Sequence, residues 1–285
     1  MKLSMLKNVA LLASAVFFMN ACAYESDIQS STLPTKVQLT HGIDESAGGG
    51  SAYIVKTVNA TYYLEKEGGG LSSVVDNDGV DWLGFHSEKG SGWKGEYRGF
   101  PNAIHKQDGN YFHAKNAGTD PSSSIIEIEE EQHVRITFTS DNGQWEGQWD
   151  FYPNRCDFTM RKVSEGFKYW VQYEGVPGGA MDESDYWYAS ADNKKHLINT
   201  PFIGDLPAPE WFAFGDEKSS RMFYVLHHED DEFPDTYASR PYMTVLGFGR
   251  NNKDKYLTTP QTFSIGFVES TQYSDIEQEI KKIIR

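Results

Sequence analysis

The sequence has few cysteines and few basic residues for its length. Only two cysteines, Cys22 and Cys156, occur among 285 residues, which excludes an extensive disulfide framework. Lysine and arginine number 26 against 41 aspartates and glutamates, so the formal net charge is −15. A nucleic-acid-binding protein would show a basic stripe, and this composition argues against that class. A polyanionic substrate is still compatible, because a local group of cations can lie within an acidic surface.

The common metal-binding and nucleophile motifs are also absent. The chain contains no HExxH, no CxxC and no GxSxG, and no internal repeat of solenoid or propeller length. The densest group of metal-ligand side chains is "HHEDDE" at residues 227–232. Its carboxylates can help to hold Ca²⁺ in a loop, or they can form a solvated acidic turn. We therefore expect that no cofactor is required, with Ca²⁺ as the one ion to test.

The first 23 residues, "MKLSMLKNVALLASAVFFMNACA", have the layout of a secretory signal peptide. Lys2 and Lys7 precede an apolar run at residues 9–19, which is too short for a stable membrane anchor. Cys22 fits a lipoprotein site, Ala21-Cys22-Ala23 fits ordinary signal peptidase, and an uncleaved segment is the third alternative. The sequence thus predicts a secreted protein, or a periplasmic or outer-membrane lipoprotein of a Gram-negative bacterium.

The remainder of the chain has the pattern of an all-β protein. Residues 24–50 are polar and rich in Ser, Thr and Gly, and are predicted to be a tether. From residue 51 onward, short apolar or alternating segments rich in Val, Tyr, Phe and Thr are separated by turn residues, as at Asp78-Gly79. Only the end, "SDIEQEIKKIIR", has helical spacing. We predict one antiparallel, two-sheet β-sandwich over residues 51–285, of galactose-mutarotase-like or jelly-roll type, with a short C-terminal helix.

The segment "GGGLSSVVDNDGVDW" resembles the opening hairpin of galactose-mutarotase-like β-sandwich proteins, which include epimerases, glycosidases and polysaccharide lyases. The blocks "GEYRGFPN", "YEGVPGG", "PEWFAFGD" and "MTVLGFGR" resemble those of secreted proteins from polysaccharide-degrading marine bacteria. The likeness extends over most of the chain, from about Thr61 to Ser270. It implies carbohydrate chemistry, including lyase action on uronic-acid polymers such as ulvan, alginate or glucuronan. It brings no established catalytic residues with it.

The stretch "WKGEYRGFPNAIH" at residues 93–105 carries the side chains that β-elimination requires. An elimination needs a group that holds the uronate carboxylate, a base for the C5 proton and an acid for the leaving oxygen. Arg98 and Asn102 are suited to the carboxylate, and Tyr97 and His105 to proton transfer. His113 can approach the same site across a hairpin centred on Asp108-Gly109. Each of these residues can instead have an ordinary structural or surface role.

Further residues are expected to bind substrate around this loop. Trp93 can stack on a neighbouring sugar and Lys94 lies beside it, while His227 and Arg250 can complete the rim. Glu174, next to a Gly- and Pro-rich turn, is the best single carboxylate for glycoside hydrolysis, which would need a second carboxylate opposite it.

Three functions remain open from the sequence. A polysaccharide lyase is preferred, and the alternatives are a glycoside hydrolase on the same fold and a non-catalytic glycan-binding surface lipoprotein. The expected partner in each case is a polysaccharide or oligosaccharide, bound by a monomer.

Overall fold

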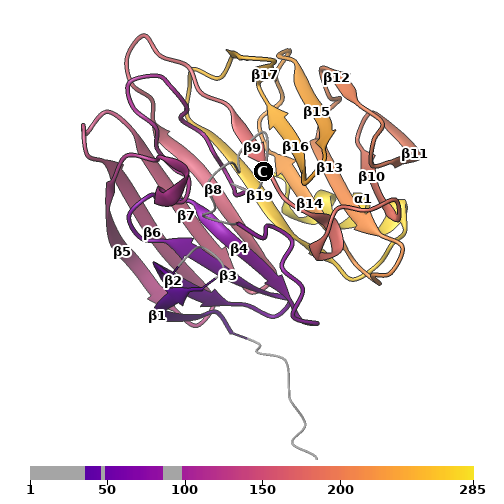
Figure 1. Cartoon of the computed structure of the whole chain (residues 1–285), viewed down its shortest axis with the longest axis horizontal. Coiled ribbons are helices and arrows are strands. Elements are labelled where there is room, and N and C mark those ends of the chain that lie inside the picture. Colours follow the sequence, from indigo (N-terminus) through magenta and orange to yellow (C-terminus); the bar gives the residue numbers. More distant parts are fainter. Residues whose placement is uncertain (1–35, 46–48, 86–97) are drawn as a thin grey trace, which may run out of the picture. The chain divides into compact units, whose positions relative to one another are not determined.

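The computed structural model describes residues 36–45, 49–85 and 98–285, together with the side chains of these residues except that of Asn116. Within them, every strand pairing is antiparallel (Figure 1). The largest sheet has nine strands. From one edge to the other they are β11 (Asp192–Leu197), β10 (Asp185–Ala189), β13 (Glu210–Asp216), β14 (Met222–His227), β19 (Gln261–Val268), β8 (Arg155–Lys162), β7 (Glu146–Tyr152), β6 (His133–Ser140) and β5 (Ser122–Glu130).

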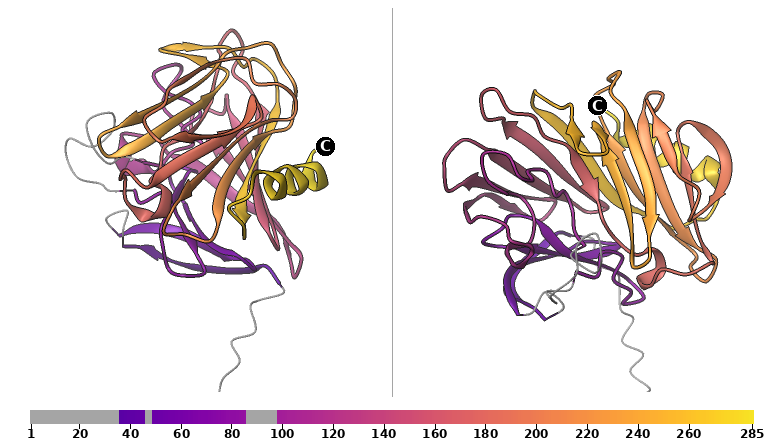
Figure 2. Two further views of the ribbon diagram at one scale, coloured as in Figure 1. Left: turned by 90° about the vertical axis from the view of Figure 1, so that its right-hand side faces the viewer. Right: turned by 45° about the horizontal axis from the view of Figure 1, so that its top comes forward.

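Two four-stranded sheets cover one face of the large sheet (Figures 1 and 2). The first contains β1 (Gln38–Asp44), β2 (Gly50–Lys56), β3 (Ala60–Glu65) and β4 (Leu71–Asp76) in that order. The second has the order β12 (Phe202–Gly204), β15 (Asp235–Arg240), β16 (Met243–Phe248) and β9 (Val171–Tyr173). The remaining elements of the described residues are the hairpin β17 (Arg250–Asn251) and β18 (Asp254–Lys255), the short 3₁₀ turns η2 (Lys115–Ala117) and η3 (Pro177–Gly179), and helix α1 (Tyr273–Ile283).

Alternating side chains of the large sheet pack in two directions. On β13, Phe212 and Phe214 point into the main core between the sheets, where both rings contact Tyr237 of β15. Trp211 and Ala213 point to the opposite face, where they pack against the apolar side of α1. The left view of Figure 2 shows α1 on that side of the large sheet and the smaller sheets on the other. The two faces account for the near-continuous apolar strands in the sequence.

The abundant aromatic residues mostly fill the core. Trp82, Trp145 and Trp149 are completely buried. Trp149 packs against Phe158 with ring centroids 5.0 Å apart, and its indole nitrogen donates a hydrogen bond to the carbonyl oxygen of Gly69 (3.1 Å). The aromatic content thus supports sheet packing rather than a row of exposed sugar-stacking rings.

The prediction of an all-β sandwich with a C-terminal helix is confirmed. The predicted turn at Asp78-Gly79 is also present, with Gly79 at φ 83° and Asp76 accepting backbone hydrogen bonds at the tip. The expected tether at 24–50 is wrong in its second half. There β1 pairs with β2 through a register that joins Gln38 to Lys56. Its side chains are largely exposed because it lies at a sheet edge, and this explains its polar sequence. In the described ranges no helix is long and apolar enough to cross a membrane.

Candidate active site

A cavity of about 510 Å³ lies beside β9. The segment 102–119, the end of β9 and the β17–β18 hairpin form its walls. Five residues singled out from the sequence line it: Asn102, His105, His113, Glu174 and Arg250. The structure therefore brings together side chains that are far apart in the sequence, from Asn102 to Arg250, 148 positions later. This volume is typical of a ligand site, for which ~300–1,000 Å³ is usual.

Backbone pairing places the loop at this cavity. Gly99 pairs with Glu174 in both directions, and the amide of Gln172 donates to the carbonyl oxygen of Pro101 (2.7 Å), so residues 99–101 extend the β9 sheet. The chain then forms the predicted tight turn, closed by pairing of Ile104 with Tyr111. Gly109 at the tip has φ 104°, a conformation that favours glycine. His105 and His113 consequently face one cavity from the two arms of the turn.

Glu174 is the centre of the hydrogen-bond network in the cavity. Its Oε2 accepts a hydrogen bond from Asn102 Nδ2 (2.9 Å), and its Oε1 accepts one from Gln172 Nε2 (3.0 Å). His113 Nε2 lies 3.8 Å from Oε2 of the same carboxylate. Glu174 is only 9% exposed, so its orientation is fixed by these neighbours rather than by solvent. The result is a preorganised carboxylate–imidazole pair at the cavity wall.

Two buried polar atoms next to this pair lack hydrogen-bond partners among the described residues. They are Nδ1 of His113 and Oε1 of Gln172. Most buried polar atoms in folded proteins are hydrogen-bonded, and the exceptions concentrate where a ligand or water is accommodated. Their position beside the cavity favours a binding role for this region over a purely structural one.

Cations gather around Trp170 on the other side of the cavity. The Arg250 guanidinium lies 4.7 Å and the Lys255 ammonium 4.1 Å from the centre of the Trp170 ring. The His105 ring is stacked on the same indole, with centroids 6.4 Å apart and an interplanar angle of 18°. The Trp170 indole nitrogen donates to the Asn102 carbonyl oxygen (2.8 Å). Trp170 is therefore covered by cations, and it positions them rather than offering a free face to a sugar.

Burial changes the proton affinity of these groups. It lowers the pKa of Lys255 to about 8, and the nearby charge of Arg250 acts in the same direction. Burial also lowers the pKa of His105, and the charges of Lys106 and Lys255 lower it further. At neutral pH the site therefore holds a neutral His105 beside a charged Lys255 and a charged Arg250, a combination suited to binding an anion next to a base.

Other predicted site residues lie elsewhere. The Arg98 Nη1 donates a hydrogen bond to the Gly84 carbonyl oxygen (2.8 Å), and its side chain lines a separate hollow of 250 Å³ with Val176 and Tyr242. His227 is 1% exposed and stacks on Phe263 in the core, so it is no part of the rim of this cavity. Trp93, Lys94 and Tyr97 lie outside the described residues.

Sequence reasoning missed Gln172, Trp170 and Lys255. Gln172 and Glu174 stand two positions apart in "VQYEG", a strand that is otherwise apolar, and this spacing places both side chains on one face. That alternation was the signal for a polar site on β9. Nothing local in the sequence around Lys255 indicates that its ammonium reaches the carbonyl oxygen of His105 (2.7 Å).

A second titratable cluster surrounds His227. Glu210 Oε2 lies 2.5 Å from His227 Nδ1, and Glu210 Oε1 accepts the Asp231 backbone amide (3.1 Å). One ligand atom each from Glu210, His227 and Asp231 lies within 4.8 Å of the others, which is compatible with a metal ion. Ca²⁺ prefers six to eight oxygen ligands, whereas here both Glu210 oxygens are already engaged. Calcium binding by the 227–232 segment stays a prediction.

Comparison with known proteins supports the fold. No protein-family model matches the chain, and no curated protein sequence matches it. Among solved structures, the crystal structure of HI1317 is similar with a TM-score of 0.52 and 13% identity, over 82% of this chain and 100% of that one. The structure of YeaD from Salmonella typhimurium, described as a "putative mutarotase", has a TM-score of 0.50 and 12% identity, over 81% and 93% of the two chains. The chain therefore has a galactose-mutarotase-like β-sandwich fold, and identities this low show the fold alone.

Proposed function

We propose that the cavity around Glu174 is the active site of a polysaccharide lyase that cleaves a uronic-acid-containing polysaccharide by β-elimination. The observation that carries this proposal is the convergence of one carboxylate, two imidazoles and a group of cations in a single cavity. The cations can hold the substrate carboxylate and the two imidazoles can remove one proton and deliver another, which are the tasks of uronate elimination.

Local charge favours an acidic saccharide. Lys106, Arg250 and Lys253 line the cavity, and the Lys255 ammonium lies over the Trp170 ring, whereas Glu174 is the one carboxylate among the described lining residues. This cationic site stands out in a protein whose net charge is −15. The guanidinium of Arg250 can bind both oxygens of a uronate carboxylate in parallel, which also stabilises the negative charge that develops when the C5 proton leaves.

The proton transfers can be assigned to the histidines. Neutral His105 takes the C5 proton, the C4–C5 double bond forms, and the bond from C4 to the glycosidic oxygen breaks. His113 delivers a proton to that oxygen, and the carboxylate of Glu174, 3.8 Å away, stabilises the protonated imidazole. Asn102 and Gln172 hold Glu174 in place as positioning residues.

Hydrolysis with two catalytic carboxylates is less well supported. Both stereochemical forms of that reaction require a pair of carboxyl groups on either side of the glycosidic bond. Among the described residues lining the cavity, Glu174 has no carboxylate partner. This distribution of side chains favours elimination, which proceeds without a second carboxylate.

Sugar epimerisation is the second candidate function, because of one specific observation. Glu174 and His113 form an adjacent carboxylate–imidazole pair, which is sufficient for exchanging protons on a sugar ring, and the fold is that of YeaD. An epimerase converts one anomer into the other without breaking the polymer, so product analysis distinguishes the two functions.

The proposal is tested by incubating the purified protein with ulvan, alginate, glucuronan and neutral glucans. Ultraviolet absorbance from an unsaturated uronate, together with new reducing ends, is expected on at least one acidic polymer. Reducing ends without that absorbance would indicate hydrolysis, and faster conversion of free anomers without either signal would indicate the epimerase. Binding without any of these products would indicate a glycan-binding protein and would contradict the lyase.

Replacing Arg250 with alanine is expected to raise KM for the acidic polymer by about 10-fold or more, because one charge-assisted contact of roughly 1.5–3 kcal/mol is lost. Arg250→Lys should restore part of this loss, since it keeps the charge but not the two-pronged geometry. Steady-state kinetics at low and high salt measure the effect. Arg161→Ala, on β8 and away from the cavity, is the matched control, and an equal loss in that variant would contradict the role of Arg250.

A further inference from the structure

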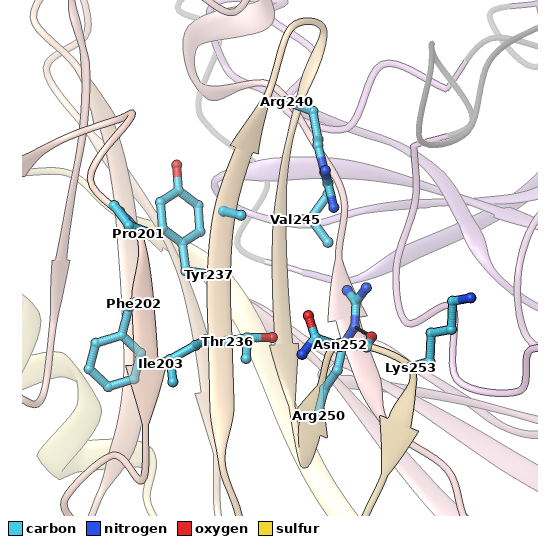
Figure 3. Close-up of a pocket in the computed structure, with 11 residues that line it drawn as sticks. Pro201, Phe202, Ile203, Thr236, Tyr237, Arg240, Val245, Arg250, Asn252 and Lys253 are labelled. Carbon is cyan, nitrogen blue, oxygen red and sulfur yellow. Dashed lines mark hydrogen bonds between the residues drawn. The ribbon is translucent and has the colours of Figure 1, made fainter.

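A second cavity adjoins the first. It has a volume of 380 Å³, and it shares Arg250, Asn252 and Lys253 with the wall of the Glu174 cavity. Figure 3 shows these three residues on one side of it and Ile203 on the other, with Thr236 and Val245 between them. Each cavity alone is within the range of ~300–1,000 Å³ that ligand sites occupy, so the two together are larger than one sugar unit requires.

The floor of this double cavity is a single row across the sheet. Ile203 pairs with Thr236, Thr236 with Gly247, and Gly247 with Gln172, so the row crosses β12, β15, β16 and β9 in register. Their neighbours Tyr237, Leu246 and Tyr173 point into the main core, so the row lies on the opposite, outward face. With strands ~4.8 Å apart, the three steps from Ile203 to Gln172 span roughly 14 Å.

Small side chains keep this face hollow. Thr236, Ala238 and Val245 line the middle of the floor, and Gly247 lies beside them in the sheet under the side chain of Arg250. A Cβ at Gly247 would lie 2.7 Å from Cδ of Arg250, so the glycine leaves room for the arginine to lie across the floor. Ile203 is 69% exposed at the far end and supplies an apolar wall.

The charged side chains described at the second cavity are all cationic. Arg250, Lys253 and Arg240 line the second cavity, and no carboxylate does so among its described lining residues. Beyond Arg240 the next hollow is lined by Asp182 and Glu183, and there the charge reverses. An anionic chain is therefore favoured in the Glu174 cavity and the second cavity, and disfavoured in the acidic hollow on the other side of Arg240.

We infer that this row is an extended binding groove for successive units of an acidic polysaccharide, with Arg250 at the junction of the two cavities, Ile203 at the far end of the row and Arg240 beside it at the end of β15. The inference rests on the proposed function, because it takes the Glu174 cavity as the site of cleavage. It defines the substrate as a polymer of several uronate units rather than a disaccharide.

The test compares Thr236→Trp, which fills the middle of the floor, with Ile125→Trp, an exposed position on edge strand β5. Affinities for glucuronan and alginate oligosaccharides, from disaccharide to octasaccharide, are measured by calorimetry on folded protein of each variant. We expect the unmodified protein to bind hexasaccharide more tightly than disaccharide. Thr236→Trp should weaken hexasaccharide binding by about 10-fold and leave disaccharide binding unchanged.

Arg240→Ala provides a second variant that does not disturb packing, because this side chain is exposed. It should weaken hexasaccharide binding and reduce its dependence on salt, again without an effect on the disaccharide. Equal affinity for all chain lengths, or equal effects of Thr236→Trp on short and long oligomers, would overturn the groove while the proposed function stands. Absence of binding to every acidic oligomer would overturn both.

Discussion

Replacing Glu174 with glutamine is expected to lower kcat for β-elimination by about 10²–10⁴-fold, the usual contribution of acid–base catalysis. Glutamine keeps the size of the side chain but removes the charge that stabilises protonated His113, whose Nε2 is 3.8 Å away. KM for the acidic polymer should not rise, because Arg250 rather than Glu174 holds the substrate carboxylate. The measurement is steady-state kinetics on whichever acidic polymer yields the unsaturated product.

A double variant separates this catalytic role from a structural one. If His113 and Glu174 act as a unit, His113→Gln combined with Glu174→Gln should be no slower than the slower single variant. Glu67→Gln is the control, since Glu67 is exposed and paired only at the surface with Lys115. Multiplicative losses in the double variant would contradict a joint catalytic role, and a rise in KM together with a lower Tm would show that Glu174 supports the fold instead.

The fold could be predicted because its signals are local. Strands such as β13 alternate between two apolar faces, and turns such as that at Gly79 carry the residues that their backbone conformations require. The edge strand β1 was missed because few of its side chains are buried, and a strand held by backbone pairing at an edge need not show an apolar face.

The candidate site was predictable where it depends on a short hairpin. His105 and His113 line the same cavity because Gly109 closes the turn between them, and sequence spacing alone carries that information. Arg98 and His227 could not be assigned in this way. The direction of Arg98 is set by a hydrogen bond to Gly84, and His227 is opposed by Glu210 through the register of β13 and β14. Register between strands is a tertiary property that one sequence does not display.

Glu210 and His227 are joined by a hydrogen bond inside the core. Gln261 Oε1 lies 2.8 Å from His227 Nε2, and an amide oxygen is only an acceptor, so Nε2 carries the hydrogen. In the neutral imidazole, Nδ1 is then an acceptor, and protonated Glu210 donates to it across 2.5 Å. Burial, with smaller contributions from Asp231 and Asp205, raises the pKa of Glu210 to about 8, and burial lowers the pKa of His227. A neutral pair avoids placing isolated charges between the sheets.

This arrangement predicts how stability depends on pH. A carboxyl group whose pKa rises from 4.5 in the unfolded chain to about 8 in the fold contributes stability that is complete below 4.5 and lost as the pH rises through 8. The lowered pKa of His227 changes stability in the opposite direction. Its contribution is complete above 6.5, the pKa in the unfolded chain, and is lost as the pH falls below that value. Below pH 6.5 the two contributions oppose each other, and above 6.5 the loss from Glu210 is no longer compensated.

Glu210→Gln isolates the carboxyl contribution. The amide can donate to His227 Nδ1 as the protonated acid does, but it does not titrate. Relative to the unmodified protein, the free energy of unfolding of this variant should therefore increase by roughly 4–5 kcal/mol between pH 4.5 and 8, at 1.36 kcal/mol for each unit of pKa shift. Urea denaturation across that pH range measures the difference. The control is Glu130→Gln, at an exposed position on β5, which should show no such pH dependence. If the free energies of unfolding of Glu210→Gln and the unmodified protein change in parallel with pH, Glu210 is ionised in the fold and the prediction is wrong.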